Sequence, residues 1–362
     1  MQDNMILVVD DDPINLTILE EILKEVYTVF TASSGEQALQ FLNDNKPDVI
    51  LLDYDMPGMN GYDVIRVLKK SATLSDIPVI FLTAQEGRDN EQKAFELGAV
   101  DYILKPISAG VVLSRINLHV ELENYRKNLE ELVMIKTTQL QNTQDSIVDI
   151  LSNVTAYRDN ETGAHIKRTT FYTEKMVNKL MELKHPDYIF TKEYAINIIK
   201  SAKLHDIGKV AVPDGILLKP GKLTADEFEI IKKHTTLGAQ LLDDAIQELG
   251  SDSSFLLTAR EIVISHHEKW DGNGYPYHIS GHNIPISGRI MAIADVYDAL
   301  VSERPYKKPF THEETMDIII KSSGNHFDPN IIEMVMPVMG EFPAIVSKYR
   351  DEHYSMRLLG SS

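Results

Sequence analysis

The sequence predicts a multidomain protein in which an α/β doubly wound domain is joined through a helical coiled-coil linker to an all-α domain. Five short apolar runs alternate with amphipathic stretches over residues 1–106, which is typical of a parallel sheet covered by helices. From Leu118 onward, apolar residues recur at alternating steps of four and three, the spacing of a coiled coil. Beyond residue 146, amphipathic helical patterns follow one another between prolines.

Composition limits the classes of protein to which the chain can belong. Its 362 residues suffice for two or three domains, and 43% hydrophobic with 25% charged residues are ordinary values for a soluble protein. The net charge of -18 disfavours binding to DNA, although bound metal ions can reverse the field locally. Neither cysteine, secretory signal nor an apolar run of roughly 18 residues is found, so we expect a cytoplasmic protein without membrane contact.

Five strands are expected in the first domain. Near-continuous Val, Ile and Leu indicates that they are buried on both faces of the sheet. The runs are Met5–Val9, Tyr27–Ala32, Asp48–Asp53, Val79–Thr83 and Asp101–Leu104. In a doubly wound fold the functional site lies at the carboxyl ends of such strands.

Polar side chains stand at these strand ends: Asp10, Asp11, Asp53, Thr83 and Lys105. Three converging carboxylates repel one another unless a hard divalent cation, best matched by magnesium (Mg), lies among them. One carboxylate can then attack phosphorus as a nucleophile, while the metal ion and Lys105 balance the developing charge.

The alternative to a metal site is that the same acidic residues only stabilise local structure. The run Asp10–Asp12 could simply cap a helix that starts near Pro13, and Asp53 could begin a turn. Asp12 itself is expected to be such a cap, because Asp followed by Pro is a good helix start.

The whole segment resembles the receiver domain of response regulators, a flavodoxin-like fold. The resemblance implies that Asp53 accepts a phosphoryl group from a histidine kinase and that Thr83 and Lys105 sense the new charge. It also places Tyr102 at the aromatic switch position, and Asp55 where the family offers a main-chain oxygen to the metal. We expect this domain to cover residues 1–122.

A helical linker is expected at residues 123–145. Its seam consists of Leu118, Leu122, Tyr125, Leu129 and Leu132, and it fades at the next step, which falls on a lysine. A two-stranded parallel coiled coil in a homodimer is the favoured interpretation. The alternative is a single amphipathic helix that packs on the helical domain that follows it, and a fragment 146–362 that stayed dimeric would count against the coiled coil.

The helical region, residues 146–362, carries five motifs rich in nitrogen and oxygen donors. They are ETGAH with Glu161 and His165, HDIGK with His205, Asp206 and Lys209, the single His234, HHEKWDGNGYP with His266, His267 and Tyr275, and ADVYDAL with Asp295. Such donors suit iron, manganese or zinc better than a thiolate-bound structural zinc. Because adjacent helical residues point about 100° apart, we expect the two neighbouring histidines to serve two ions, or one ion and its substrate.

In order and context these motifs resemble the HD-GYP family of metal phosphohydrolases, which hydrolyse cyclic di-GMP; the resemblance leaves open whether the final product is linear pGpG or GMP. The resemblance implies two or three iron (Fe) or manganese (Mn) ions, with Asp206 as the bridging ligand and Glu161 and His165 associated with a third ion. The other implied ligands are His205, His234, His266, His267 and Asp295. Metal ions lower the pKa of water from about 15.7 to near 7 and so supply a nucleophile at neutral pH.

Substrate contacts are implied as well. Lys209, three positions after Asp206, is expected to orient the scissile phosphate, and Arg304 and Lys307 to contact the ligand's phosphates. Tyr275 is expected to pack on the ligand or to form a hydrogen bond with it.

Two classes of function are consistent with these motifs. The favoured one is a cyclic di-GMP phosphodiesterase controlled by phosphorylation of Asp53, with diguanylate cyclases among its implied partners. The other is a non-catalytic adaptor that binds cyclic dinucleotides. A hydrolase that prefers cyclic GMP-AMP also stays open, because the sequence identifies no base-reading residue.

Overall fold

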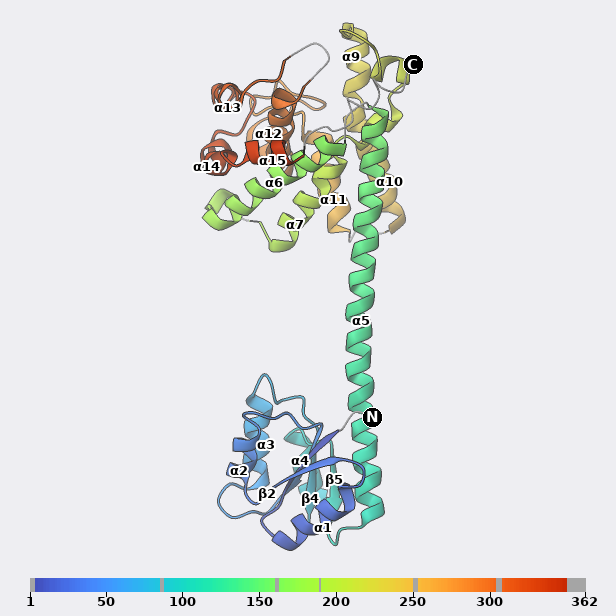
Figure 1. Ribbon diagram of the computed structural model, residues 1–362, viewed down its shortest axis with the longest axis vertical. Helices are drawn as coiled ribbons and strands as arrows, with labels where there is room; N and C mark the ends of the chain where they lie inside the picture. Colours follow the sequence, from blue (N-terminus) through green and yellow to red (C-terminus); the bar gives the residue numbers. More distant parts are fainter. Residues whose placement is uncertain are drawn as a thin grey trace. The chain divides into compact units, whose positions relative to one another are not determined.

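The computed structural model describes residues 4–84, 88–159, 163–188, 190–249, 253–303 and 308–349. The chain divides into two compact units, Met1–Thr138 and Gln139–Ser362 (Figure 1). Within the described ranges, every helix is too short or too polar to cross a lipid bilayer.

The first unit contains a five-stranded parallel sheet in the order β2-β1-β3-β4-β5. Its strands are β1 (Met5–Val9), β2 (Thr28–Ala32), β3 (Val49–Asp53), β4 (Val79–Thr83) and β5 (Asp101–Leu104). The α/β fold class is thereby confirmed, and β2 and β3 begin one residue later than expected. The pairing of Asp53 with Leu82 and of Thr83 with Leu104 brings the strand ends to one edge.

Helices cover both faces of this sheet because side chains alternate along each strand. Ile6 and Val8 of β1 pack in the core with α1 (Pro13–Leu23) and the start of α5 (Ala109–Arg158). Leu7 and Val9 pack in the opposite core with α2 (Gly35–Phe41), α3 (Gly61–Lys70) and α4 (Arg88–Glu96). Asp12 caps α1 as expected, with its side chain accepting a hydrogen bond from the amide of Ile14.

One uninterrupted helix, α5, runs from Ala109 to Arg158. The predicted domain boundaries at residues 122 and 145 both fall inside it and stay predictions. The five predicted seam residues are all exposed on its surface, from Leu118 at 48% to Tyr125 at 73%.

The second unit is helical. Its α-helices after α5 are α6 (Gly163–Leu183), α7 (Lys192–Ser201), α8 (Asp214–Leu217), α9 (Ala225–Lys232), α10 (His234–Leu249), α11 (Ser254–Ser265), α12 (Ile286–Val301), α13 (His312–Lys321), α14 (Pro329–Met339) and α15 (Phe342–Lys348). Short 3-10 helices are η1 (Pro186–Tyr188), η2 (Ala202–Leu204), η3 (Ile207–Ala211) and η4 (Gly281–Asn283). The main core lies among α6, α7, α12, α14 and α15, where Tyr172 stacks on Phe342 and Tyr297 meets both rings edge-on.

Helix breaks in this unit place the candidate ligands. After Ser201 the chain tightens from α7 into η2 and η3, and His205 and Asp206 lie between these two 3-10 helices. A second break, at Lys233, lets α10 begin at His234.

Candidate active site

At the carboxyl edge of the receiver sheet, acidic groups surround a lysine. Asp10, Asp11 and Asp53 each bring one carboxylate oxygen within 4.8 Å of the others. The ammonium of Lys105 lies 2.6 Å from Oδ1 of Asp53 and 2.9 Å from Oδ2 of Asp10. The arrangement suits a magnesium ion, because carboxylate oxygens are the ligands that this ion prefers.

The electrostatics of this edge depend on burial. Burial raises the pKa of Asp53, and its hydrogen bond with Lys105 offsets only part of that rise. Burial alone would lower the pKa of Lys105, but the hydrogen bonds to Asp53 and Asp10 outweigh it and leave that pKa raised. Asp55 is exposed, and its backbone amide donates a hydrogen bond to Asp53.

The two predicted switch residues lie on neighbouring strands, β4 and β5. Thr83 ends β4, and Tyr102 on β5 lies with its ring 6.1 Å from that of Phe95 in an edge-on contact.

In the helical unit, two groups of donors gather around one carboxylate. Asp206, His234, His266 and His267 each offer one atom within 4.8 Å of the others. The same holds for His165, His205 and Asp295. Seven of the eight predicted metal ligands are thus brought together; the eighth, Glu161, lies outside the described residues.

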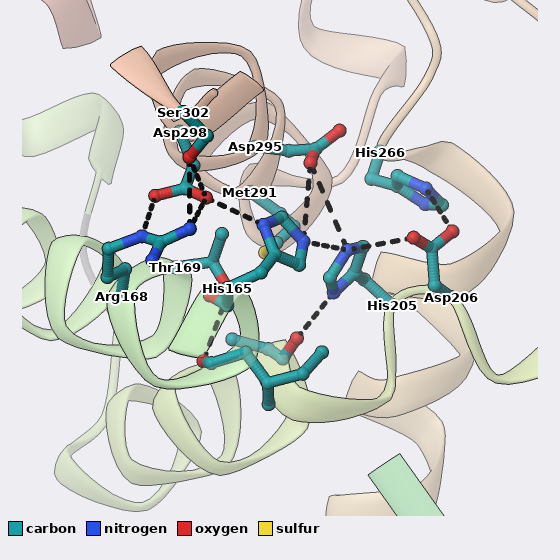
Figure 2. A network of polar contacts seen from close by, with 12 residues as sticks. His165, Arg168, Thr169, His205, Asp206, His266, Met291, Asp295, Asp298 and Ser302 are labelled. Carbon is teal, nitrogen blue, oxygen red and sulfur yellow. Dashed lines mark hydrogen bonds and ion pairs between the residues drawn. The ribbon is translucent and has the colours of Figure 1, made fainter. Parts of the chain in front are cut away.

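Asp206 touches both groups (Figure 2). Its Oδ1 lies 3.2 Å from Nε2 of His234 and 3.8 Å from Nε2 of His266, while its Oδ2 lies 3.2 Å from Nε2 of His205. Each carboxylate oxygen therefore faces a different group, as a bridging ligand requires.

Backbone carbonyls orient three of the histidines. The Nδ1 of His205 lies 2.9 Å from the carbonyl oxygen of Ala202, that of His234 lies 2.8 Å from Ile231, and that of His266 lies 3.0 Å from Ile262. A carbonyl only accepts, so each Nδ1 carries the proton and each Nε2 keeps its lone pair toward the site.

His165 is oriented by a carboxylate instead. Its Nδ1 lies 2.8 Å from Oδ2 of Asp298, and Asp298 is held by Nε and Nη2 of Arg168 at 2.7 and 2.8 Å (Figure 2). Its Nε2 thus faces Nε2 of His205 at a distance of 3.5 Å. Two lone pairs at that separation repel each other unless a cation lies between them.

Buried polar atoms without hydrogen-bond partners also indicate that these residues can bind metal ions. Among the described residues, Nε2 of His234, Nε2 of His266 and Oδ1 of Asp206 are buried without a hydrogen-bond partner, although His234 and Asp206 lie within ion-pair distance. Such atoms cost about 1–3 kcal/mol each when nothing satisfies them. Coordinated metal ions would satisfy all three atoms.

Burial keeps most of these imidazoles neutral, the form that binds metal. It lowers the pKa of His266 to about 3 and also lowers those of His234 and His267. In His205 burial acts in the same direction, but the carboxylate of Asp206 outweighs it and raises the pKa. A proton and a metal ion therefore compete for Nε2 of His205.

Two glycines allow the close approach that brings Asp206 to His234. A Cβ added at Gly208 in η3 would lie 1.8 Å from the carbonyl oxygen of His234 and 2.6 Å from the amide nitrogen of Gly238. A Cβ at Gly238 would lie 2.7 Å from Val263 on α11. The glycines of HDIGK and HTTLG thus let η3 and α10 pack backbone against backbone, with the side chain of Val263 on α11 against Gly238.

The HHEKWDGNGYP segment leaves the helix at its first histidine. His266 is the C-cap of α11, so His267 follows a chain that turns away, and the two rings lie 4.0 Å apart. The premise that both histidines lie on a helix is therefore wrong, and one donor atom of each lies in the same group.

The rest of that segment folds back on Glu268. The Oε1 of Glu268 accepts a hydrogen bond from the amide of Tyr277 at 2.7 Å, and a Cβ added at Gly274 would lie 2.4 Å from the Cα of Glu268. This turn places the ring of Tyr275 4.8 Å from that of His267, while the ammonium of Lys232 lies 5.5 Å from the centre of the tyrosine ring.

Lys209 lies beside the bridging carboxylate. Its ammonium is 2.8 Å from Oδ2 of Asp206 and 2.5 Å from Oδ2 of Asp159. A small cavity opens here, and Thr155, Asp159, Asp206 and Lys209 are among the residues that line it. Arg304 and Lys307, the predicted phosphate contacts, lie outside the described residues.

Comparisons with known proteins agree with both halves of this description. Residues 6–117 match the response regulator receiver domain, and residues 158–331 match the HD domain. A probable cyclic di-GMP phosphodiesterase of Vibrio cholerae is 41% identical over 97% of this chain and 81% of its own length. The cyclic di-GMP phosphodiesterase response regulator RpfG of Xanthomonas campestris is 31% identical over 95% of this chain and 90% of its own.

The chain belongs to the cyclic di-GMP phosphodiesterase response regulators. A 3'3'-cGAMP-specific phosphodiesterase of Vibrio cholerae is 38% identical as well, but over 66% of this chain and 43% of its own length. The matches to the two family models confirm the receiver and HD-type resemblances that the sequence motifs indicated.

Sequence reasoning missed the residues that support the ligands of this response regulator. Asp298 and Arg168 are both almost fully buried; Asp298 holds His165, Arg168 holds Asp298, and Asp159 holds Lys209. A signal for Asp298 was present, because it follows Asp295 by three positions and so lies on the same face of α12. Arg168 follows His165 by three positions on α6 in the same way.

Proposed function

We propose that this response regulator hydrolyses cyclic di-GMP to pGpG and further to GMP, and that phosphorylation of Asp53 by a histidine kinase controls the reaction. The observation that carries the proposal is the pair of donor groups that share Asp206, with the ammonium of Lys209 beside the same carboxylate. Buried neutral imidazoles, carboxylates and a cation are the parts that a metal-dependent phosphodiesterase needs.

The gathered ligands divide between two ions in this proposal. His234, His266 and His267 would hold one metal ion with Asp206, and His165, His205 and Asp295 would hold another. Iron or manganese ions bound there polarise the phosphodiester and lower the pKa of water. Glu161 would add a ligand for a third ion.

Two further residues act on the substrate rather than on the metal. Lys209, held by Asp159, balances charge on the scissile phosphate. Tyr275 presents a ring next to His267, where a guanine base or the ribose can pack.

Substitution of Asp206 tests the site. We expect Asp206→Ala to abolish turnover of cyclic di-GMP by protein purified anaerobically and loaded with manganese or ferrous iron. The control is Asp317→Ala, because Asp317 is an exposed residue of α13 that pairs with Lys321 at 3.5 Å. Elemental analysis of both variants should show fewer bound ions in Asp206→Ala alone, and unchanged turnover in that variant would refute the site.

Cyclic GMP-AMP is the second candidate substrate, because two relatives of this chain are named for it. Competition between the two dinucleotides distinguishes the candidates, and we expect the higher kcat/KM for cyclic di-GMP. Tight binding of either dinucleotide without product after metal loading would instead support the non-catalytic adaptor.

The remaining parts of the proposal concern assembly. A magnesium ion among Asp10, Asp11 and Asp53 would assist phosphoryl transfer from the histidine kinase. Two copies would pair through the seam on α5 in the cytoplasm, and association with diguanylate cyclases stays a prediction.

A further inference from the structure

Exposed apolar side chains continue along α5 beyond Lys136, where the sequence pattern predicted that the seam fades. Leu140 is 70% exposed, Ile147 52%, Ile150 61%, Val154 56% and Tyr157 77%. Exposed apolar side chains along so much of one helix need an explanation, because such surface is normally covered by a partner.

The spacing of these residues joins the two halves into one seam. From Leu118 to Leu132 the steps alternate between four and three, and two successive steps of four then lead through Lys136 to Leu140. From Leu140 the steps again alternate, through Thr143, Ile147, Ile150, Val154 and Tyr157. Two steps of four amount to a four-residue insertion in the heptad pattern, a stutter, which locally unwinds a coiled coil.

Without the stutter, the seam would run onto polar residues. A strict heptad pattern from Leu132 passes through Gln139, Ser146 and Asn153 instead of Leu140, Ile147 and Val154. At about 100° per residue, the series with the stutter stays on one stripe of a straight helix.

The opposite side of α5 is buried against other elements in each unit. In the first unit Val112, Ile116 and Val120 are buried in the receiver core. In the second unit Val148 packs in a small core with Leu204 and Ala259, and Ala156 is also buried. The exposed stripe is thus not needed for packing within either unit.

A second copy of this chain fits the stripe best. A narrow apolar line over about 60 Å of helix calls for a partner helix of equal length and matching period, which another α5 supplies. In a parallel pair, Glu121 would face Arg126 of the second copy across the seam, two opposite charges. The other flanking positions that would face each other carry no like charges; Gln139 meets Gln144, for example.

We propose that two copies pair in parallel and in register along one seam from Leu118 to Tyr157, with a stutter at Lys136–Leu140. The inference rests on the homodimer of the proposed function and extends it from the linker into the catalytic unit. The last turns of this seam lie on the same stretch of α5 whose other side carries Ser152, Thr155 and Ala156 into the cavity beside Asp206. The dimer contact thus lies directly behind one wall of the active site.

Disulfide crosslinking tests the register, because the natural chain has no cysteine. Single cysteines are introduced in the full-length protein as Ile147→Cys and Val154→Cys, and one residue earlier as Ser146→Cys and Asn153→Cys. Leu122→Cys reports on the linker part of the seam. Gln141→Cys, at an exposed position outside the seam, reports on crosslinking by random collision. After mild oxidation, the covalent dimer is quantified on a denaturing gel.

We expect Leu122→Cys, Ile147→Cys and Val154→Cys to form covalent dimer severalfold faster than their neighbours or Gln141→Cys. If Ser146→Cys and Asn153→Cys crosslink instead, the heptad pattern continues without a stutter and the inference is overturned. If Leu122→Cys alone crosslinks, the homodimer stands but the seam ends in the linker. If no variant exceeds Gln141→Cys, the homodimer itself fails, whereas hydrolysis of cyclic di-GMP is tested separately by Asp206→Ala.

Discussion

Asp298 shows how a residue that touches no substrate can control the metal centre. It accepts from Nδ1 of His165 and from two nitrogens of Arg168, so it fixes which nitrogen of the imidazole keeps its lone pair. The ion pair also holds the pKa of Asp298 well below its ordinary value, despite burial that acts to raise it. His165 is therefore oriented by a carboxylate that stays charged.

Asp298→Asn is expected to weaken binding of the metal ion near His165 by about 10–100-fold. The amide keeps the shape of the carboxylate but loses the charge that stabilises the Nδ1–H tautomer. Metal stoichiometry after dialysis against buffers of fixed free manganese measures the effect per folded protein. Asp317→Asn, on the exposed face of α13, is the matched control, and equal metal content in the two variants would contradict the argument.

At the scale of elements, the site depends on how closely η3 approaches α10. The Cβ of an alanine at position 208 would lie 1.8 Å from the carbonyl oxygen of His234, and this oxygen belongs to the backbone and cannot rotate away. Such a contact would push η3 and α10 apart. Asp206 would then move away from His234, which belongs to the same donor group.

Gly208→Ala is therefore expected to lower stability by about 1–3 kcal/mol through overpacking, and to lower metal affinity with it. For a unit of this size that corresponds to a fall of roughly 2–12 °C in Tm, measured by differential scanning calorimetry. Gly215→Ala is the control, because no atom lies within 4 Å of a Cβ added in α8. Unchanged metal binding in Gly208→Ala would show that the two elements can separate without loss of the site.

The elements differ in how far the sequence predicts them. The strands of the receiver sheet are predicted within one residue because the apolar runs are short and end at charged residues such as Asp10 and Asp53. The amphipathic patterns after residue 146 predict helices, but the chain changes to 3-10 geometry after Ser201. The same segment leads to the close contact of Gly208 with α10, a tertiary contact that a local sequence pattern does not show.

The same limit applies to the site. The motifs identified seven ligands that the structure brings together, since each is a donor within a short local pattern. The meeting of His266 and His267 in one group was missed, because it requires the helix to end at His266. The link from Lys209 to Asp159 was also missed, because the two residues lie 50 positions apart and meet only in the folded chain.

At the scale of the whole molecule, bound metal should stabilise the helical unit and leave the receiver sheet unaffected. A ligand at 100 times its Kd adds about 2.7 kcal/mol, which corresponds to about 5–11 °C in the Tm of that unit. Removal of metal with a chelator should lower that transition, and manganese, but not magnesium alone, should restore it. The same treatment of Asp206→Ala should produce a much smaller shift, and an equal shift in both proteins would place the stabilising ion elsewhere.

Control of the enzyme should depend on the carboxylate of Asp53. Its Oδ1 lies 2.6 Å from the ammonium of Lys105, so a phosphoryl group added there meets a cation already in place. Acetyl phosphate with magnesium is expected to change the rate of cyclic di-GMP hydrolysis in the natural protein but not in Asp53→Asn, which lacks the nucleophile. Asp55→Asn is the matched control, because Asp55 is exposed and is predicted to contribute its main-chain oxygen, which the substitution retains. A response to acetyl phosphate that persists in Asp53→Asn would show that the receiver is not the input, whatever the chemistry at Asp206.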